Sequence, residues 1–78
     1  MKEPLFVRSL TGIERTALRR GLRSPQAFTL RRSQTLLLSA EGKTPRQIAR
    51  QLGCSDQTVR NVIRAFESEA LACLEQKS

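Results

Sequence analysis

Residues 44–66 read TPRQIARQLGCSDQTVRNVIRAF, and this stretch marks its secondary structure more clearly than any other part of the chain. Thr44 combines with Pro45 and Gln47 in three signals for a helix start: an N-cap hydroxyl, a proline at the first helical position and the partner residue of a capping box. Gly53 is the expected end, because glycine adopts a left-handed backbone at little cost. The pattern predicts a helix of about two turns between Pro45 and Gly53.

A further helix follows this glycine. Ser55 is placed to cap it, and apolar residues then recur at the i, i+3, i+4 and i+7 spacing of one helix face: Val59, Val62, Ile63 and Phe66. Side chains that form hydrogen bonds occupy the opposite face at the same spacing: Gln57, Arg60, Asn61 and Arg64. One side of this helix is therefore expected to be buried, and the other to be exposed and rich in hydrogen-bonding groups.

The two helices meet the steric requirements of a helix-turn-helix unit over residues 45–66. Ala49 is the small residue where the helices would cross, and Gly53 can take the positive φ of the turn. Apolar residues at suitable spacings fill the angle between the helices: Ile48, Leu52, Val59 and Val62. Cys54 is expected to be a small apolar plug in the turn. An ordinary αα-hairpin inside a small bundle is the alternative.

The chain before residue 44 carries weaker helical signals. Residues 1–10 show no period and are interpreted as a flexible N-terminal arm. Thr11 and Glu14 match a capping box for a first helix, which should end near Gly21. Its apolar side is expected to contain Leu10, Ile13, Ala17 and Gly21, with Leu18 and Leu22 adjacent. The next helix starts either at Ser24, which precedes a proline, or nearer to Thr29, and ends at Gly42.

The chain is predicted to be an all-α bundle of four helices that forms one domain over residues 11–75, with a tail over residues 76–78. After Phe66 a weak helical period in Leu71 and Leu74 leaves open a C-terminal helical extension to about Gln76.

Composition narrows the class of function. The chain has 78 residues, with 14 Lys and Arg against 7 Asp and Glu, and no histidine. The absence of histidine excludes a Ser–His triad, a Cys–His pair and a Cys₂His₂ zinc site, and the single aspartate, Asp56, argues against a carboxylate metal centre. No apolar run is long enough to span a membrane, and the start lacks a secretory signal. We expect no enzyme activity, cofactor, metal or membrane partner, and a cytoplasmic location with Cys54 and Cys73 reduced.

Charge makes nucleic acid the first partner to consider. Residues 1–66 carry 13 of the basic residues against four acidic ones, whereas residues 67–78 are net negative. Most of the basic residues are arginine, which suits bidentate contacts to phosphate and guanine. A solvated, arginine-rich surface is the alternative. A further alternative is binding to anionic membranes, but the lack of Trp and the polar face of the last helix argue against it.

In a helix-turn-helix bound to DNA, the second helix lies in the major groove. The candidate base-reading residues are those that start this helix and face outward: Ser55, Asp56, Gln57, Thr58, Arg60, Asn61 and Arg64. Gln57 and Asn61 can each pair bidentately with adenine, and Arg60 can contact guanine through two acceptors. Simpler roles stay open for these residues. Asp56 also complements the helix dipole, and Ser55 and Thr58 also suit helix capping or phosphate contact. Gln57 and Asn61 also suit an ordinary solvent-exposed position.

Contacts to the DNA phosphates are expected from residues around this helix: Arg31, Arg32, Thr44, Arg46 and Arg50. Thr44 and Arg46 lie at a helix N-terminus, where free amides and the dipole favour phosphate. On the arm, Lys2 and Arg8 are candidates for a minor-groove contact. Three further basic residues lie near the end of the first helix, where the dipole alone favours positive charge: Arg19, Arg20 and Arg23.

Residues 31–53, RRSQTLLLSAEGKTPRQIARQLG, resemble the N-terminal, homeodomain-like DNA-binding region of mariner-type bacterial insertion-sequence transposases. The likeness includes the G-x₅-I-A-x₂-L-G core from Gly42 to Gly53, which related regulators share, and it continues to Phe66. The stretch from Leu10 to Leu18 is similar to the family's first helix, and the likeness covers roughly residues 10–75. The family usually ends the recognition helix with a glycine, where this chain has Ala70.

The resemblance implies a homeodomain-like helix-turn-helix that recognises the terminal inverted repeats of a transposon and so positions a separate catalytic domain. In the family that domain carries a metal-binding acidic triad, which these residues lack, so catalysis is not carried over. The chain is then an excised domain, a truncated transposase or a small stand-alone relative. Double-stranded DNA is the expected partner, in the bacterial cytosol and associated with the nucleoid.

Two alternative functions stay open. The chain also fits a small DNA-binding transcriptional regulator. It further fits a helical protein-interaction module that forms a homodimer through Leu71, Leu74 and the acidic tail, and this role is compatible with DNA binding because helix-turn-helix proteins often bind as dimers.

Overall fold

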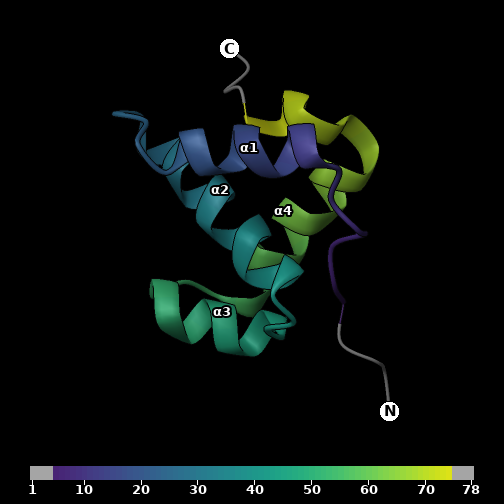
Figure 1. Ribbon diagram of the computed structural model, residues 1–78. Coiled ribbons are helices and arrows are strands. Elements are labelled where there is room, and N and C mark those ends of the chain that lie inside the picture. The colour runs from purple at the N-terminus through teal and green to yellow at the C-terminus, as the bar shows by residue number, and fades with distance from the viewer. Residues whose placement is uncertain (1–4, 75–78) are drawn as a thin grey trace.

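The structure, a computed structural model, describes residues 5–74. Within this range the chain forms four α-helices and one short 3₁₀ helix: α1 (Gly12–Gly21), α2 (Ala27–Ala40), α3 (Pro45–Leu52), α4 (Asp56–Glu69) and η1 (Ala70–Leu74). Figure 1 shows α1 and η1 at one end of the molecule, α3 at the other, and α2 and α4 between them. α1 makes no contact with α3. The prediction of an all-α bundle of four helices is confirmed.

Both predicted capping boxes are present. In α1 the Glu14 amide donates to the Thr11 hydroxyl at 3.1 Å, and the Thr11 amide donates to the Glu14 carboxylate at 3.0 Å. In α3 the Gln47 amide donates to the Thr44 hydroxyl at 3.2 Å, and the Thr44 amide donates to the Gln47 side chain at 2.9 Å. These bonds satisfy amides that the first helical turn leaves without a partner, so both helices begin where the sequence predicts.

The turn between α3 and α4 also has the predicted geometry. Gly53 ends α3 in the left-handed conformation, with φ of 71° and ψ of 38°. The Cys54 amide then donates to the Ala49 carbonyl at 3.0 Å, and the Ser55 hydroxyl accepts from the Thr58 amide at 3.1 Å. The chain therefore leaves one helix and enters the next with its end groups satisfied, which fixes the angle between α3 and α4.

The start of α2 lies between the two predicted alternatives. Its N-cap is Gln26, whose side chain makes no capping bond. The Ser24 hydroxyl instead accepts from the Gln26 amide at 3.1 Å, so Ser24 stabilises a turn two residues before the helix. The bond satisfies the Gln26 amide just before the helix, which begins at Ala27.

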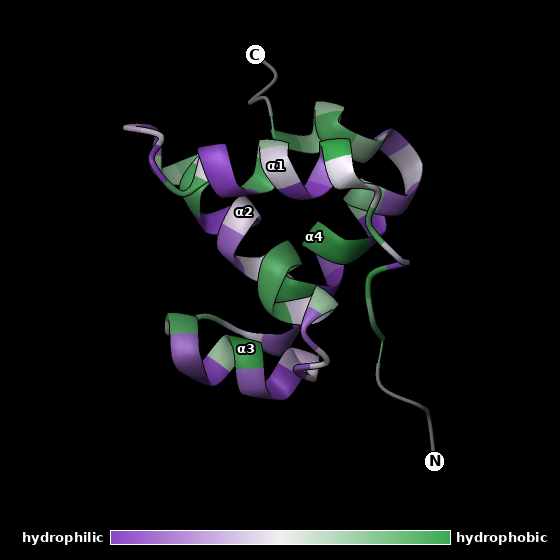
Figure 2. Ribbon diagram, viewed as in Figure 1, coloured by the Kyte–Doolittle hydropathy of each residue, from purple (hydrophilic) through white to green (hydrophobic). Residues whose placement is uncertain are grey.

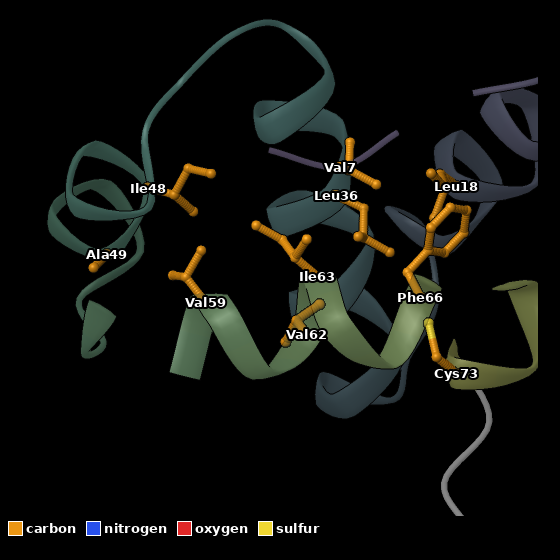
Figure 3. Packing of buried hydrophobic residues seen from close by; sticks show 10 residues of the cluster. All are labelled: Val7, Leu18, Leu36, Ile48, Ala49, Val59, Val62, Ile63, Phe66 and Cys73. Atoms are coloured by element: carbon orange, nitrogen blue, oxygen red, sulfur yellow. The ribbon is translucent and has the colours of Figure 1, made fainter. Parts of the chain in front are cut away.

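The core is built mainly on α4. Figure 3 shows its buried residues pointing toward the other helices, with Val59 near Ile48 of α3 and Phe66 near Leu18 of α1. The four apolar residues predicted for α4 are all buried: Val59, Val62, Ile63 and Phe66. Figure 2 shows hydrophilic and hydrophobic segments alternating along α3, as expected for a helix buried on one face only. The prediction for α1 is partly wrong, because Ile13 is 79% exposed and Leu18 takes the buried position.

Residues 5–10 differ from the flexible arm expected for residues 1–10. Val7 is buried, and its amide donates to the Ser39 hydroxyl of α2 at 2.8 Å. The Arg8 guanidinium donates two hydrogen bonds to the Glu14 carboxylate, at 2.6 and 2.7 Å, and lies 4.7 Å from the centre of the Phe66 ring. Arg8 is therefore engaged within the bundle rather than free for a minor groove, and Lys2 lies outside the described residues.

The Arg8–Glu14 pair also changes the acidity of the carboxyl. Two hydrogen bonds from the Arg8 guanidinium, followed by the bond from the Thr11 amide, lower the pKa of Glu14 from 4.5 to about 2. The carboxylate is thus held in its charged form while it caps α1 and anchors residues 5–10 to that helix.

The C-terminal extension is a 3₁₀ helix rather than a continuation of α4. α4 ends at Glu69, and Ala70 takes φ of 51° and ψ of −135°, which turns the chain back. Leu71 and Leu74, the residues considered for a homodimer, are half-buried and pack against the core cluster of their own chain. The predicted end of the domain at residue 75 and the tail over residues 76–78 lie outside the described residues.

Candidate nucleic-acid interface

The polar face of α4 is exposed along its length. All seven residues predicted to read bases are exposed to solvent: Ser55, Asp56, Gln57, Thr58, Arg60, Asn61 and Arg64. The opposite face is fixed in the core, with Val59, Ile63 and Phe66 fully buried. Because side chains three and four residues apart share a helix face, Gln57, Arg60, Asn61 and Arg64 form one row, which we call the reading row. The structure therefore brings together the residues that the sequence predicts to act together.

Two amides of the reading row contact each other. The Gln57 side-chain nitrogen donates to the Asn61 side-chain oxygen at 2.9 Å. This bond leaves both hydrogens on the Asn61 nitrogen and the Gln57 oxygen available, and the Asn61 oxygen has a second lone pair. The pair therefore presents donors and acceptors in a defined orientation, which is the requirement for bidentate contact with a base edge.

Arg60 and Arg64 complete the reading row with positive charge. Neither forms a hydrogen bond or an ion pair with another residue in the range 5–74. They are one helical turn apart, so their charges repel each other in the unbound molecule. Both guanidinium groups are thus free to donate to a partner that offers acceptors or negative charge.

The first residues of α4 already have structural roles. The Ser55 and Thr58 hydroxyls lie 2.9 Å apart and share a hydrogen bond, and Ser55 also accepts from the Thr58 amide. Asp56 lies exposed in the first turn, where a negative charge complements the helix dipole. These three residues fix the start of the helix, so the simpler capping and dipole roles considered for them are present in the structure.

The residues predicted to contact phosphate differ in their environment. Arg46 and Arg50 are exposed one turn apart on α3. Thr44 is half-buried, and its hydroxyl is used in the capping box. Arg31 is exposed on α2, with one guanidinium nitrogen 3.4 Å from the Leu52 carbonyl at the end of α3.

Arg32 is engaged within the protein. Its guanidinium stacks 4.5 Å from the centre of the Phe28 ring and donates to the Cys73 carbonyl of η1 at 3.1 Å. The Thr29 hydroxyl donates to the neighbouring Leu74 carbonyl at 2.8 Å. Arg32 and Thr29 thus hold η1 against α2, a role that sequence analysis missed because the partners are more than 40 residues apart along the chain.

A hollow of about 340 Å³ lies beside the reading row, between α2 and α4. The residues that line it include Thr58 and Asn61 from α4 and Phe28 and Arg31 from α2. Neither Phe28 nor the hollow was predicted, since nothing in the local pattern of α2 shows that its first turns face α4. The hollow places the first half of α2 directly beside the reading row.

The described residues also bear on metal binding, thiol reactivity and membrane insertion. In residues 5–74 no three His, Cys, Asp or Glu side chains come together in a way that would hold a metal ion. Cys73 is buried, and this burial raises the pKa of its thiol, so the less reactive protonated form is favoured. None of the described helices has the length and apolar character needed to cross a membrane.

Comparison with known proteins identifies the domain type. A family model described as "Homeodomain-like domain" matches residues 27–75, which span α2, α3, α4 and η1. No curated protein and no solved structure matches the chain.

Proposed function

The chain belongs to the homeodomain-like domain family, whose helix-turn-helix indicates DNA binding, and we propose that it binds double-stranded DNA in a sequence-specific manner with α4 in the major groove. The observation that carries the proposal is the reading row. It consists of two amides in a fixed orientation and two free guanidinium groups, on a helix whose other face is buried. These are the side chains that discriminate adenine and guanine from other bases.

In this proposal the residues divide into two groups. Base edges are contacted by the residues that start α4 and face outward: Ser55, Asp56, Gln57, Thr58, Arg60, Asn61 and Arg64. Phosphates are contacted by residues of α2 and α3: Arg31, Arg32, Thr44, Arg46 and Arg50. Arg32 would have to leave the Cys73 carbonyl to reach a phosphate, so it contributes less than Arg31. The exposed arginines supply the salt-dependent part of the affinity, and the reading row supplies the specificity.

The finer proposal is that the DNA site is the terminal inverted repeat of an insertion sequence. The similarity of residues 31–66 to the DNA-binding region of mariner-type transposases supports it. A small transcriptional regulator is the second candidate, since regulators share the core from Gly42 to Gly53. For either DNA site, the reading row has the same role, which is to contact the bases.

Selection from random duplex DNA tests the proposal. The protein is expected to enrich one motif, and Arg60→Ala should lower affinity for that motif by about 1–3 kcal/mol and relax the preference at one base pair. Arg15→Ala, which removes an exposed arginine from α1, is the matched control and should keep the preference. If Arg60→Ala discriminates the motif from random duplexes as well as the parent does, α4 is not the reading helix.

The enriched motif also separates the two candidates. A motif without internal symmetry, found in the source genome as inverted pairs that flank a transposase-like coding region, supports end recognition. A palindrome, or scattered single copies beside promoters, supports a regulator and contradicts the transposon assignment.

A further inference from the structure

Three arginines surround one hollow on the surface of α1, far in sequence from the helix-turn-helix. The hollow has a volume of about 230 Å³ and is lined by Thr16, Arg19, Arg20 and Arg23. No acidic side chain in the described part of the chain pairs with any of the three guanidinium groups. The residues lie outside the range matched by the homeodomain-like family model. We call Arg19, Arg20 and Arg23 the elbow cluster, because they lie where the chain turns from α1 into α2.

The helix dipole explains only part of this cluster. Arg19 and Arg20 are in the last turn of α1, where positive charge is favoured, but Arg23 lies beyond the C-cap residue Leu22. Arg15 and Arg19 are also four residues apart on α1, a spacing at which like charges repel within a helix. Three guanidinium groups around one hollow with no internal partner form a site for an anion with several oxygens.

The start of α2 links the elbow cluster to the hollow beside the reading row. Ala27 follows Arg23 by only four positions, so their Cα atoms are at most about 14 Å apart. Ala27 and Arg31 line the hollow that Thr58 and Asn61 of α4 share. Figure 1 shows the turn after α1 projecting from the bundle where α2 begins. A major groove is about 12 Å wide, so phosphate backbone flanks a helix that lies in it, and the start of α2 lies on one flank of α4.

We propose that the elbow cluster binds the phosphate backbone of the same duplex, beside the segment that α4 reads. The inference rests on the proposed function, since it needs α4 in the major groove. It extends the contact beyond the helix-turn-helix unit to one flank only, because the elbow lies at the N-terminal end of α2. The cluster adds affinity without adding base preference, since phosphates carry no sequence information.

The test compares duplex lengths with charge-removing variants. The selected motif is placed in a duplex of about three helical turns and in two shorter duplexes, each cut at a different edge of the motif. The triple variant Arg19→Gln, Arg20→Gln, Arg23→Gln is expected to reduce the slope of log K against log salt by about 2.7. Relative to 1 M salt, this slope change weakens binding to the long duplex by about 500-fold at 0.1 M salt. Circular dichroism checks that each variant keeps its helix content.

The shorter duplexes locate the contact. Removing one flank should weaken the parent protein to the level of the triple variant, and removing the other flank should leave the parent unchanged. Single variants give a matched control: Arg23→Gln should reduce the salt slope by about one, whereas Arg15→Gln, an equal charge change outside the hollow, should reduce it less.

The experiment distinguishes failure of the elbow inference from failure of the proposed function. If the parent enriches a motif and Arg60→Ala loses the preference, but the triple variant binds the long duplex like the parent, the elbow inference is wrong and the proposed function stands. If no motif is enriched, or Arg60→Ala keeps the parent's preference, the proposed function itself fails, and the elbow inference fails with it.

Discussion

The side-chain nitrogen of Gln57 donates a hydrogen bond of 2.9 Å to the side-chain oxygen of Asn61, one turn further along α4. Both residues are exposed, and between them on the buried side lies Val59, which is fully inaccessible to solvent. The bond therefore orients two amides on a helix that cannot rotate about its own axis without disrupting the core. Such preorganisation reduces the entropy lost when a side chain binds a base edge.

This pair predicts coupled specificity. Asn61→Ala should lower discrimination at one base pair by about 1–3 kcal/mol. Gln57→Ala should weaken the same preference because Asn61 loses its orienting partner, so the double variant should lose less than the sum of the single losses. Competition binding with duplexes that differ at each motif position measures this coupling. Strictly additive losses would mean that the two amides act independently.

Substitutions at the neighbouring residues Arg31 and Arg32 are predicted to differ in effect, the first on DNA binding and the second on stability. Arg31→Ala should weaken binding to all duplexes alike and reduce the salt slope by about one, since Arg31 is exposed beside the reading row. Arg32→Ala should mainly lower stability, because Arg32 holds the Cys73 carbonyl and stacks on Phe28. Salt titrations of binding and urea titrations of folding measure the two effects. A larger salt-slope change for Arg32→Ala than for Arg31→Ala would reverse these roles.

Ala70→Gly should stabilise the protein. Ala70 has φ of 51° and ψ of −135°, a conformation that glycine adopts far more easily than alanine. Relief of backbone strain worth about 1–3 kcal/mol outweighs the extra entropy of glycine in the unfolded chain, so a net gain of about 1 kcal/mol is expected in urea unfolding. Ala72→Gly in the same 3₁₀ helix is the control and should give no gain. If the Ala70→Gly variant is no more stable than the parent, the backbone at Ala70 is not strained.

Gly21 and Ser33 define how closely α1 approaches α2. A Cβ atom on Gly21 would lie 1.9 Å from the Ser33 hydroxyl oxygen and 2.9 Å from its Cβ atom. Gly21→Ala should therefore cost about 1–3 kcal/mol of stability through overpacking. The Ser33 hydroxyl is buried without a hydrogen-bond partner among the described residues, so Ser33→Ala should stabilise by about 1 kcal/mol.

A combined variant checks that these two effects share one contact. In the Ser33→Ala background, Gly21→Ala should cost less than it does alone, because the nearest clashing atom has been removed. Thermal or urea unfolding of the four proteins gives the comparison. If Gly21→Ala lowers the free energy of unfolding equally in both backgrounds, contact with the Ser33 hydroxyl is not the cause of its effect.

Glu14 predicts a specific loss of stability in acid. Its pKa is lowered to about 2 in the folded protein by the hydrogen bonds from Arg8 and then by the Thr11 amide. A carboxyl with a lowered folded pKa stabilises the fold above its unfolded value, near 4.5, and this contribution is lost as the pH falls from there toward 2.

The Glu14→Gln variant tests this dependence. It should unfold at lower urea concentration than the parent at pH 7, and the difference between the two should shrink as the pH falls below 4.5. Glu41→Gln, which changes an exposed glutamate, is the matched control and should follow the parent. A stability difference between Glu14→Gln and parent that is the same at pH 7 and pH 2.5 would contradict the role of the Arg8–Glu14 pair.

The features that the sequence predicted well depend on local spacing. The capping boxes at Thr11 and Thr44 join residues three positions apart, and Gly53 ends its helix through its own backbone freedom. The buried face of α4 follows directly from helical periodicity. The reading row is the other face of the same periodic pattern, which is why its residues could be named before the structure.

The features that were missed depend on contacts between distant residues. The Val7 amide meets Ser39 across 32 positions, and Arg32 meets Cys73 across 41. No local pattern specifies such pairs, so residues 5–10 were expected to be free and Arg32 to be available. Ile13 was assigned to the buried side of α1 because it is apolar, although the packing of α1 on α2 buries Leu18 instead.

The central claim is that the exposed face of α4 contacts DNA bases. Mapping backbone amide shifts by NMR, with a short duplex carrying the selected motif, tests it most directly. We predict that the largest changes fall on residues 57–64, with smaller ones at the start of α3. Changes confined to α1 and η1, with residues 57–64 unaffected at saturating DNA, would contradict the claim.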